Sequence, residues 1–171
     1  YIDTATGAAL PEYASLKFRP GSGNMSDFNV GSACSYPMMR VEEMYFIEAE
    51  AAAQQNPAQG VNLLNDFMSN YRDPQYKCTK SSKEDVVKEI VFQKRVELWG
   101  EGQSFFDIKR LNLPVTRGYA GTLHHTIGRF NTTTRPAWMN FCIVRSEGNN
   151  NTALVGFENP DPSDVYSSWA E

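Results

Sequence analysis

Three carboxylates close together in the chain are the residues whose types are suited to catalysis. Glu97 and Glu101 are one helical turn apart, and Asp107 follows soon after them. A glycoside hydrolase needs two carboxyl groups that face each other across a sugar ring, about 5 Å or about 6.5–9.5 Å apart. On one helix the two glutamates would instead lie one above the other, with no cleft between them. We therefore expect a structural role for these carboxylates, and a glycoside hydrolase fragment is the less favoured function.

The other chemically reactive residues have no spacing that supports catalysis or metal binding. His124 and His125 are the only histidines, and adjacent residues do not converge on one metal ion from a helix face. Cys34, Cys78 and Cys142 lie far apart, which favours free thiols over a disulfide and excludes a CxxC metal site. No serine lies in a GxSxG turn. The sequence therefore predicts no metal, no cofactor and no enzymatic activity.

A long helix that starts after Ser82 and is broken at Gly100 and Gly102 must position the carboxylates. Ser82 and Asp85 match a capping box, in which a hydroxyl and an acidic side chain satisfy the first backbone N–H groups of a helix. Glycine is typical of the residue that ends a helix. A short helix follows, and we expect Ser104 to cap it.

The long helix carries apolar residues on two arcs that face opposite directions. One arc is built around Val86 and Ile90, and the other around Phe92, Val96 and Trp99. We therefore expect neighbours on both sides of this helix, with Trp99 in the core. Charged side chains on or between these arcs must be paired, because an isolated buried ion is prohibitively costly. The expected ion network consists of Arg40, Lys94, Arg95, Glu97, Glu101, Asp107 and Arg110.

Two antiparallel helices joined as a hairpin are predicted before the long helix. The first, over 38–53, has apolar residues on nearly every face, so we expect it to be largely buried. Asn56 and Pro57 suit the N-cap and the first position of the second helix, whose apolar residues form one stripe up to Tyr71. The hairpin is close in length to one tetratricopeptide unit.

The whole chain is predicted to be mainly α, with a tetratricopeptide-like hairpin, a long helix and irregular coil at both ends. Residues 1–36 form a loop-rich N-terminal segment, 37–112 the helical body and 113–171 a coil-rich C-terminal segment. A short strand is expected at most near 16–18, and short strands or buried extended segments only at 139–145 and 153–157.

Aromatic residues in the C-terminal coil are the feature that favours ligand binding. Trp138 and Tyr119 lie in polar coil rather than on a helix stripe, and exposed rings can stack on the apolar face of a ligand. Together with Arg129, they are the candidate ligand-binding residues. The alternative is that such aromatic residues anchor the coil to the helical body.

Composition and charge exclude several classes of protein. The chain has 171 residues and a net charge of −4 without any basic run, so we expect no nucleic-acid partner. No apolar run approaches the roughly 20 residues that a membrane-spanning helix needs. The length suits one domain. The first residues, YIDTATG, do not resemble a signal peptide, and we expect a mature or internal fragment of a longer protein.

Several stretches resemble one protein family. RVELWGEGQSFFDIKRL at 95–111 resembles the C-terminal signature of the SusD/RagB family, in which a basic residue, Glu-Leu, Glu-Gly, Asp and a final Arg recur at these spacings. MMRVEEMYFIEAEAAA at 38–53 resembles the other recurrent helix of the family, and ENPDPSD resembles its closing Asn-Pro. The chain has Gln93-Lys94, Ser104 and Ile143-Val144 where the family often has Glu-Arg, Arg and Ile-Pro, which indicates a subgroup.

This resemblance implies a fold and a function. Family members are tetratricopeptide-like, lipid-anchored proteins on the outer, cell-surface face of the outer membrane of Bacteroidetes. They bind oligosaccharides, polysaccharides or peptides without catalysis, and cap a SusC-like TonB-dependent transporter that imports the nutrient. Because they are longer than this chain, 1–171 would be the C-terminal region, and the lipid anchor would belong to another part. A tetratricopeptide-type scaffold that binds only protein, suggested by the hairpin at 38–71, is the alternative.

Overall fold

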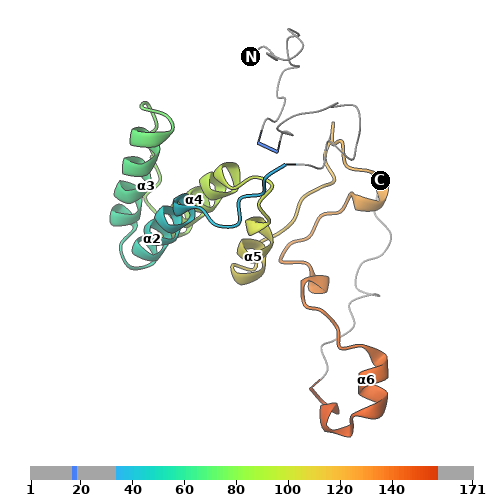
Figure 1. Cartoon of the computed structure of the whole chain (residues 1–171). Coiled ribbons are helices and arrows are strands. Elements are labelled where there is room, and N and C mark those ends of the chain that lie inside the picture. Colours follow the sequence, from blue (N-terminus) through green and yellow to red (C-terminus); the bar gives the residue numbers. More distant parts are fainter. Residues whose placement is uncertain (1–16, 19–33, 158–171) are drawn as a thin grey trace.

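In the part of the chain that the structure describes, residues 17–18 and 34–157, four helices form the body of the molecule (Figure 1). In this computed structural model they are α2 (Val41–Gln55), α3 (Pro57–Tyr71), α4 (Lys83–Glu97) and α5 (Gln103–Arg110), and α6 (Arg145–Asn150) follows in the C-terminal coil. These residues contain no strand, and an isolated antiparallel bridge joins Thr116 and Asn131. The predicted mainly α class is confirmed.

Helices α2 and α3 form the predicted hairpin. Asn56 caps α3 by accepting a hydrogen bond from the Ala58 amide at 3.1 Å, and Pro57 is the first helical residue, where its missing N–H costs nothing. Gly60 lets the two helices approach closely, because a Cβ atom at this position would collide with Ala53 of α2. Local signals therefore fix the turn, and one small residue fixes how closely the helices pack.

The core lies where α2, α3 and α4 meet. The ring of Phe46 in α2 packs edge-on against that of Phe67 in α3, with centroids 5.1 Å apart. The buried cluster consists of Phe46, Ala49, Ala53, Leu64, Phe67, Cys78, Val86 and Ile90. Burial of apolar surface at about 25 cal/mol per Å² makes this cluster the main source of stability.

Helix α4 begins as predicted but is packed on one side only. The Asp85 amide donates to Oγ of Ser82 at 3.1 Å, and this hydroxyl donates to the Asp85 carboxylate at 2.8 Å, so the capping box is confirmed. The prediction that both arcs are buried was wrong. Phe92, Val96 and Trp99 are 53%, 60% and 55% exposed, because α2 and α3 pack on the opposite side of the helix.

The expectation that the helix over 38–53 is largely buried was also wrong. Helix α2 starts at Val41, and the preceding Met38 and Met39 are strongly exposed. Met44 and Ile47 within the helix are each 47% exposed. Helices α3 and α4 contact α2, and together they cover only the face that carries its buried residues.

The corner between α4 and α5 depends on glycine. Gly100 and Gly102 have φ angles of 78° and 82°, in the left-handed region that side chains with a Cβ atom rarely adopt. The ring of Phe18 lies directly against Gly100, where a Cβ atom would collide with it. Gly102 is the N-cap of α5, so the predicted cap at Ser104 was wrong and this serine lies inside the helix.

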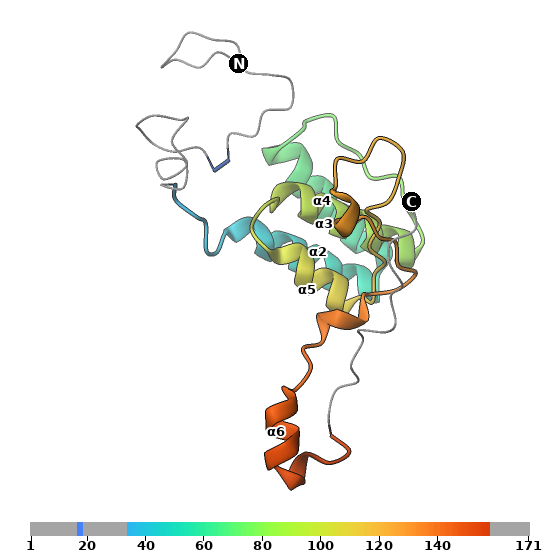
Figure 2. The same cartoon turned by 90° about the vertical axis from the view of Figure 1, so that its right-hand side faces the viewer.

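The C-terminal coil folds into short helical turns instead of the expected strands. Helical segments occupy Ala137–Met139, Arg145–Asn150 and Thr152–Leu154, so the strands expected at 139–145 and 153–157 were wrong. The side-chain amide of Asn150 donates to the carbonyl of Ser146 at 2.7 Å, which supports a helical turn. Lys17 and Phe18 form a turn, and the rest of the strand expected near 16–18 lies outside the described residues. Figures 1 and 2 both show α6 at the end of an arm that leaves the helical body.

Candidate functional site

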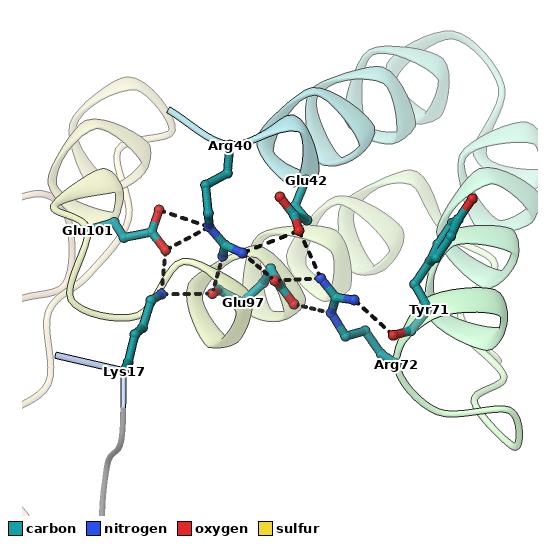
Figure 3. Close-up of polar contacts among 7 residues, drawn as sticks. All are labelled: Lys17, Arg40, Glu42, Tyr71, Arg72, Glu97 and Glu101. Carbon is teal, nitrogen blue, oxygen red and sulfur yellow. Dashed lines mark hydrogen bonds and ion pairs between the residues drawn. The ribbon is translucent and has the colours of Figure 1, made fainter. Parts of the chain in front are cut away.

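Charged side chains from four parts of the chain meet at the corner after α4 (Figure 3). Arg40 pairs through Nε with Glu101 at 3.0 Å and through Nη1 with Glu97 at 3.0 Å. Arg72 holds both oxygens of Glu97, at 2.6 Å from Nε and 2.8 Å from Nη2. Lys17 also pairs with Glu101. We call Lys17, Arg40, Glu42, Arg72, Glu97 and Glu101 the corner cluster.

The corner cluster overcomes the repulsion between Glu97, the last residue of α4, and Glu101, which lies in the corner after the helix and not on it as predicted. The side chain of Glu101 is only 5% exposed and that of Glu97 13% exposed, so neither can rely on water. Hydrogen bonds from Arg72 hold the pKa of Glu97 below its ordinary value, against the opposing effect of burial. Arg40 and Lys17 also donate to the backbone carbonyl of Glu97, at 2.7 and 3.1 Å. These cations therefore also satisfy the C-terminal end of α4.

A second group of charges joins α5 to α2 and α4. Arg110 forms a bidentate ion pair with Glu50, in which Nη1 and Nη2 each donate to one carboxylate oxygen at 2.6 Å. Its Nε donates to Asp107 at 2.9 Å. Lys94 pairs with the same Asp107 oxygen at 3.1 Å. Hydrogen bonding to Glu50 raises the pKa of Arg110, so this guanidinium stays charged. Within the described residues the other oxygen of Asp107 has no hydrogen-bond partner.

The predicted ion network thus divides into two groups, and Arg95 belongs to neither. Arg95 follows Lys94 by one residue, which turns it about 100° round the helix, away from Asp107, the partner of Lys94. It is exposed and forms no ion pair with any described residue. With Phe92, Val96, Trp99 and other residues it lines a cavity of about 350 Å³. We call Phe92, Arg95 and Val96 of α4, together with Trp99 just after its end, the outer face of α4.

The geometry of the carboxylates is unsuited to acid–base catalysis. Glu97 at the end of α4 and Glu101 in the corner after it are both held by cations, and Asp107 is buried against Lys94 and Arg110. A general acid needs a raised pKa, whereas the pKa of Glu97 is lowered. The described residues hold no group of three or more His, Cys, Asp or Glu side chains placed to bind a metal ion.

The candidate ligand-binding residues lie in one loop, 115–138, but have different environments. Trp138 is 39% exposed. Its ring packs edge to face with that of the buried Phe130, and the two ring centroids are 5.8 Å apart. Arg129 donates through Nε to the carbonyl of His124 at 2.7 Å, which holds the loop closed. Tyr119 is 58% exposed. Trp138 and Arg129 therefore help to shape the loop, and Tyr119 offers the largest exposed fraction to a ligand.

Sequence reasoning missed two features of these sites. Arg72 completes the corner cluster, yet it stands 25 residues from Glu97 and no local pattern connects the two. The outer face of α4 was visible as a stripe of Phe92, Val96 and Trp99, but an apolar stripe alone does not say whether anything packs on it.

Comparison with known proteins identifies relatives. A family model described as the SusD family matches residues 6–160. The chain is also similar to a crystal structure of a SusD-like carbohydrate binding protein from Bacteroides vulgatus ATCC 8482, with 27% sequence identity and a TM-score of 0.61. The match covers 80% of this chain and 33% of that protein, so the chain spans about a third of its length. A search of curated proteins gave no match. Within the described residues no helix has the length and hydrophobicity needed to cross a membrane.

Proposed function

The chain belongs to the SusD family, and on this premise we propose that it is a glycan-binding part of a cell-surface nutrient uptake system. The observation that carries this proposal is the family match over residues 6–160, together with a structural relative named as a SusD-like carbohydrate binding protein. The protein binds oligosaccharide or polysaccharide and does not cleave it. No cofactor takes part.

The loop 115–138 is our proposed contact with the glycan. Tyr119 presents an exposed ring, and Trp138, at the far end of the same loop, is partly exposed. Aromatic rings stack on the C–H faces of sugars, and guanidinium groups such as that of Arg129 donate hydrogen bonds to hydroxyl groups. The carboxylates of Glu97 and Glu101 in the corner cluster are ion-paired, so neither is available as a general acid, which supports a non-catalytic role.

The partner and the location that we propose follow from the family. The partner is a SusC-like TonB-dependent transporter of the outer membrane, and the protein lies on the cell-surface face of that membrane through a lipid anchor. We further propose that residues 1–171 form the C-terminal region of a longer SusD-like protein. The coverage of only 33% of the structural relative supports a longer parent protein, and the C-terminal placement rests on the resemblance of 95–111 to the C-terminal signature of the family.

Isothermal titration against a panel of oligosaccharides tests the proposed function. We expect saturable heat with at least one glycan and a smaller affinity in Tyr119→Ala, because that exposed ring contributes stacking. Tyr71→Ala is a matched control, since Tyr71 is 60% exposed but lies on α3. Heat with peptides and with no glycan would contradict the proposal. It would favour the protein-interaction scaffold, which should purify without an outer-membrane transporter.

A further inference from the structure

The outer face of α4, which consists of Phe92, Arg95, Val96 and Trp99, borders a second cavity. This cavity has a volume of about 490 Å³ and lies between α4 and the segment 111–114. Phe92 and Arg95 line both this cavity and the one of about 350 Å³, so the two are neighbours along the helix. Each volume falls within the range of known ligand sites, about 300–1,000 Å³.

The charges around the second cavity are mainly positive, although the whole chain carries −4. Lys83, Lys88 and Arg95 line it, and Glu84 is the acidic residue among its described lining residues. None of the three cations forms an ion pair with a described residue. Glu89 on the same helix already accepts hydrogen bonds from two other side chains. As far as the described residues are concerned, these cations therefore keep their hydrogen-bond donors available for a ligand.

The aromatic wall of the smaller cavity is held in place before any ligand arrives. The ring of Phe18 lies 5.9 Å from that of Trp99 and rests against Gly100. The neighbouring Lys17 pairs with Glu101, which fixes Phe18 at this corner. A ring that is already positioned loses little conformational freedom on binding, so its contact contributes more to affinity.

We propose that the outer face of α4 binds an oligosaccharide that contains uronic acid residues. The rings of Phe92 and Trp99 suit the apolar faces of sugars. The guanidinium of Arg95 suits a carboxylate, which it can hold with two parallel hydrogen bonds. Lys83 and Lys88 provide positive charge for further uronates along the second cavity. That the ligand is a glycan rests on the proposed function. That the ligand is negatively charged is inferred from the cations of this face alone.

Nuclear magnetic resonance of the labelled 171-residue chain, titrated with trigalacturonate, tests this site. We expect saturable shifts of the backbone amides of Phe92, Arg95 and Trp99. The affinity should fall as salt is raised, because salt screens exposed charges. The methyl ester of the same trimer lacks the negative charges and should bind about tenfold more weakly.

Two variants separate charge recognition from stacking. Arg95→Gln should weaken trigalacturonate binding about tenfold, since a charge-assisted pair is lost. Trp99→Ala should weaken both the trimer and its ester, because the stacking ring serves either ligand. Arg145→Gln is the matched control, because Arg145 is an exposed arginine on α6. Circular dichroism verifies folding. If Trp99→Ala unfolds, Arg95→Gln still tests the inference, because Arg95 is exposed and its replacement leaves the core intact.

The outcomes distinguish this inference from the proposed function. Shifts confined to the loop 115–138, or binding of neutral glycans alone, would overturn the inference and support the proposed function. No binding of any glycan would contradict both. Tetraglutamate that binds as tightly as trigalacturonate, with no effect of Trp99→Ala, would indicate a merely basic surface and would also overturn the inference.

Discussion

Arg72 is the residue through which three helices are tied together at one end of the body (Figure 3). It follows α3 directly, holds Glu97 at the end of α4, and reaches Glu42 in the first turn of α2 at 3.2 Å. Its guanidinium also lies over the ring of Phe67, 5.2 Å from the centroid. The planar guanidinium makes two parallel bonds to Glu97, a geometry that lysine cannot reproduce.

We expect Arg72→Ala to lower the free energy of unfolding by about 1–3 kcal/mol, because the nearly buried Glu97 loses hydrogen bonds to a charged partner. Arg72→Lys should recover only part of this loss. Urea denaturation gives both values. Arg145→Ala is the control and should be neutral, since Arg145 is exposed on α6. A stability of Arg72→Ala equal to that of the parent would show that the corner cluster is not stabilising.

The lowered pKa of Glu97 makes stability depend on pH in acid. The carboxylate is ionised in both the folded and unfolded states at neutral pH, so its stabilising effect is fully present there. As pH falls below the ordinary value of 4.5, the unfolded chain takes up a proton that the folded chain still refuses. Stability is then lost until the pH passes through the lowered pKa of the folded state.

This pH dependence is measured by urea denaturation at a series of pH values from neutral to acid, with the midpoint urea concentration of unfolding as the readout. We expect the midpoint to fall as the solution is acidified, and the fall to be smaller in Glu97→Gln, which cannot titrate. A variant whose midpoint falls as steeply as that of the parent would show that other carboxylates cause the acid sensitivity.

At the scale of elements, the close crossing of α2 and α3 depends on Gly60. Alanine has a higher intrinsic helix propensity than glycine by about 1 kcal/mol. A methyl group at position 60 would nevertheless approach the Ala53 Cα to 2.8 Å and the Ala49 carbonyl oxygen to 2.9 Å. Since both are backbone atoms, which cannot turn aside as a flexible side chain can, the two helices would have to move apart.

Gly60→Ala should therefore destabilise the protein by about 1–3 kcal/mol, the usual cost of overpacking a core. Gly148→Ala is the matched control, because Gly148 lies in α6 with no atom close to the position of a new Cβ. It should leave stability unchanged or raise it slightly. The melting temperatures of both variants test this prediction. A Gly60→Ala variant with a higher melting temperature than the parent would contradict the close crossing of α2 and α3.

Features that depend on a few neighbouring residues were predictable from sequence. Asn56 and Pro57 marked the hairpin turn, and Ser82 with Asp85 marked the start of α4, because caps are satisfied within one helical turn. Burial was less predictable. The stripe that includes Trp99 has the spacing of a packed face, but what covers a face is decided by distant parts of the chain.

The same limit applies to the candidate sites. The need for cations near Glu97 and Glu101 followed from electrostatics alone, yet their identity required the fold to bring Lys17 and Arg72 to the corner. In the coil, the composition around Trp138 predicted irregular structure. Its contact with Phe130 depends on a pairing between distant loop residues, which no spacing rule encodes.

At the scale of the whole molecule, the helical body has two faces that the described residues leave open. One includes Met44 and Ile47 of α2, and the other is the outer face of α4. The chain spans about a third of its structural relative. In our account the helices provide a rigid, ion-paired scaffold, and the glycan is held by side chains outside the corner cluster and is not cleaved.

Native mass spectrometry of the chain mixed with an oligosaccharide tests this central claim most directly, since one spectrum reports both binding and cleavage. Our account predicts a species with the mass of the chain plus one intact oligosaccharide, unchanged after prolonged incubation. Shortened oligosaccharides that accumulate with time would contradict the non-catalytic role. A spectrum with only the unbound chain, for neutral and acidic glycans alike, would contradict glycan binding itself.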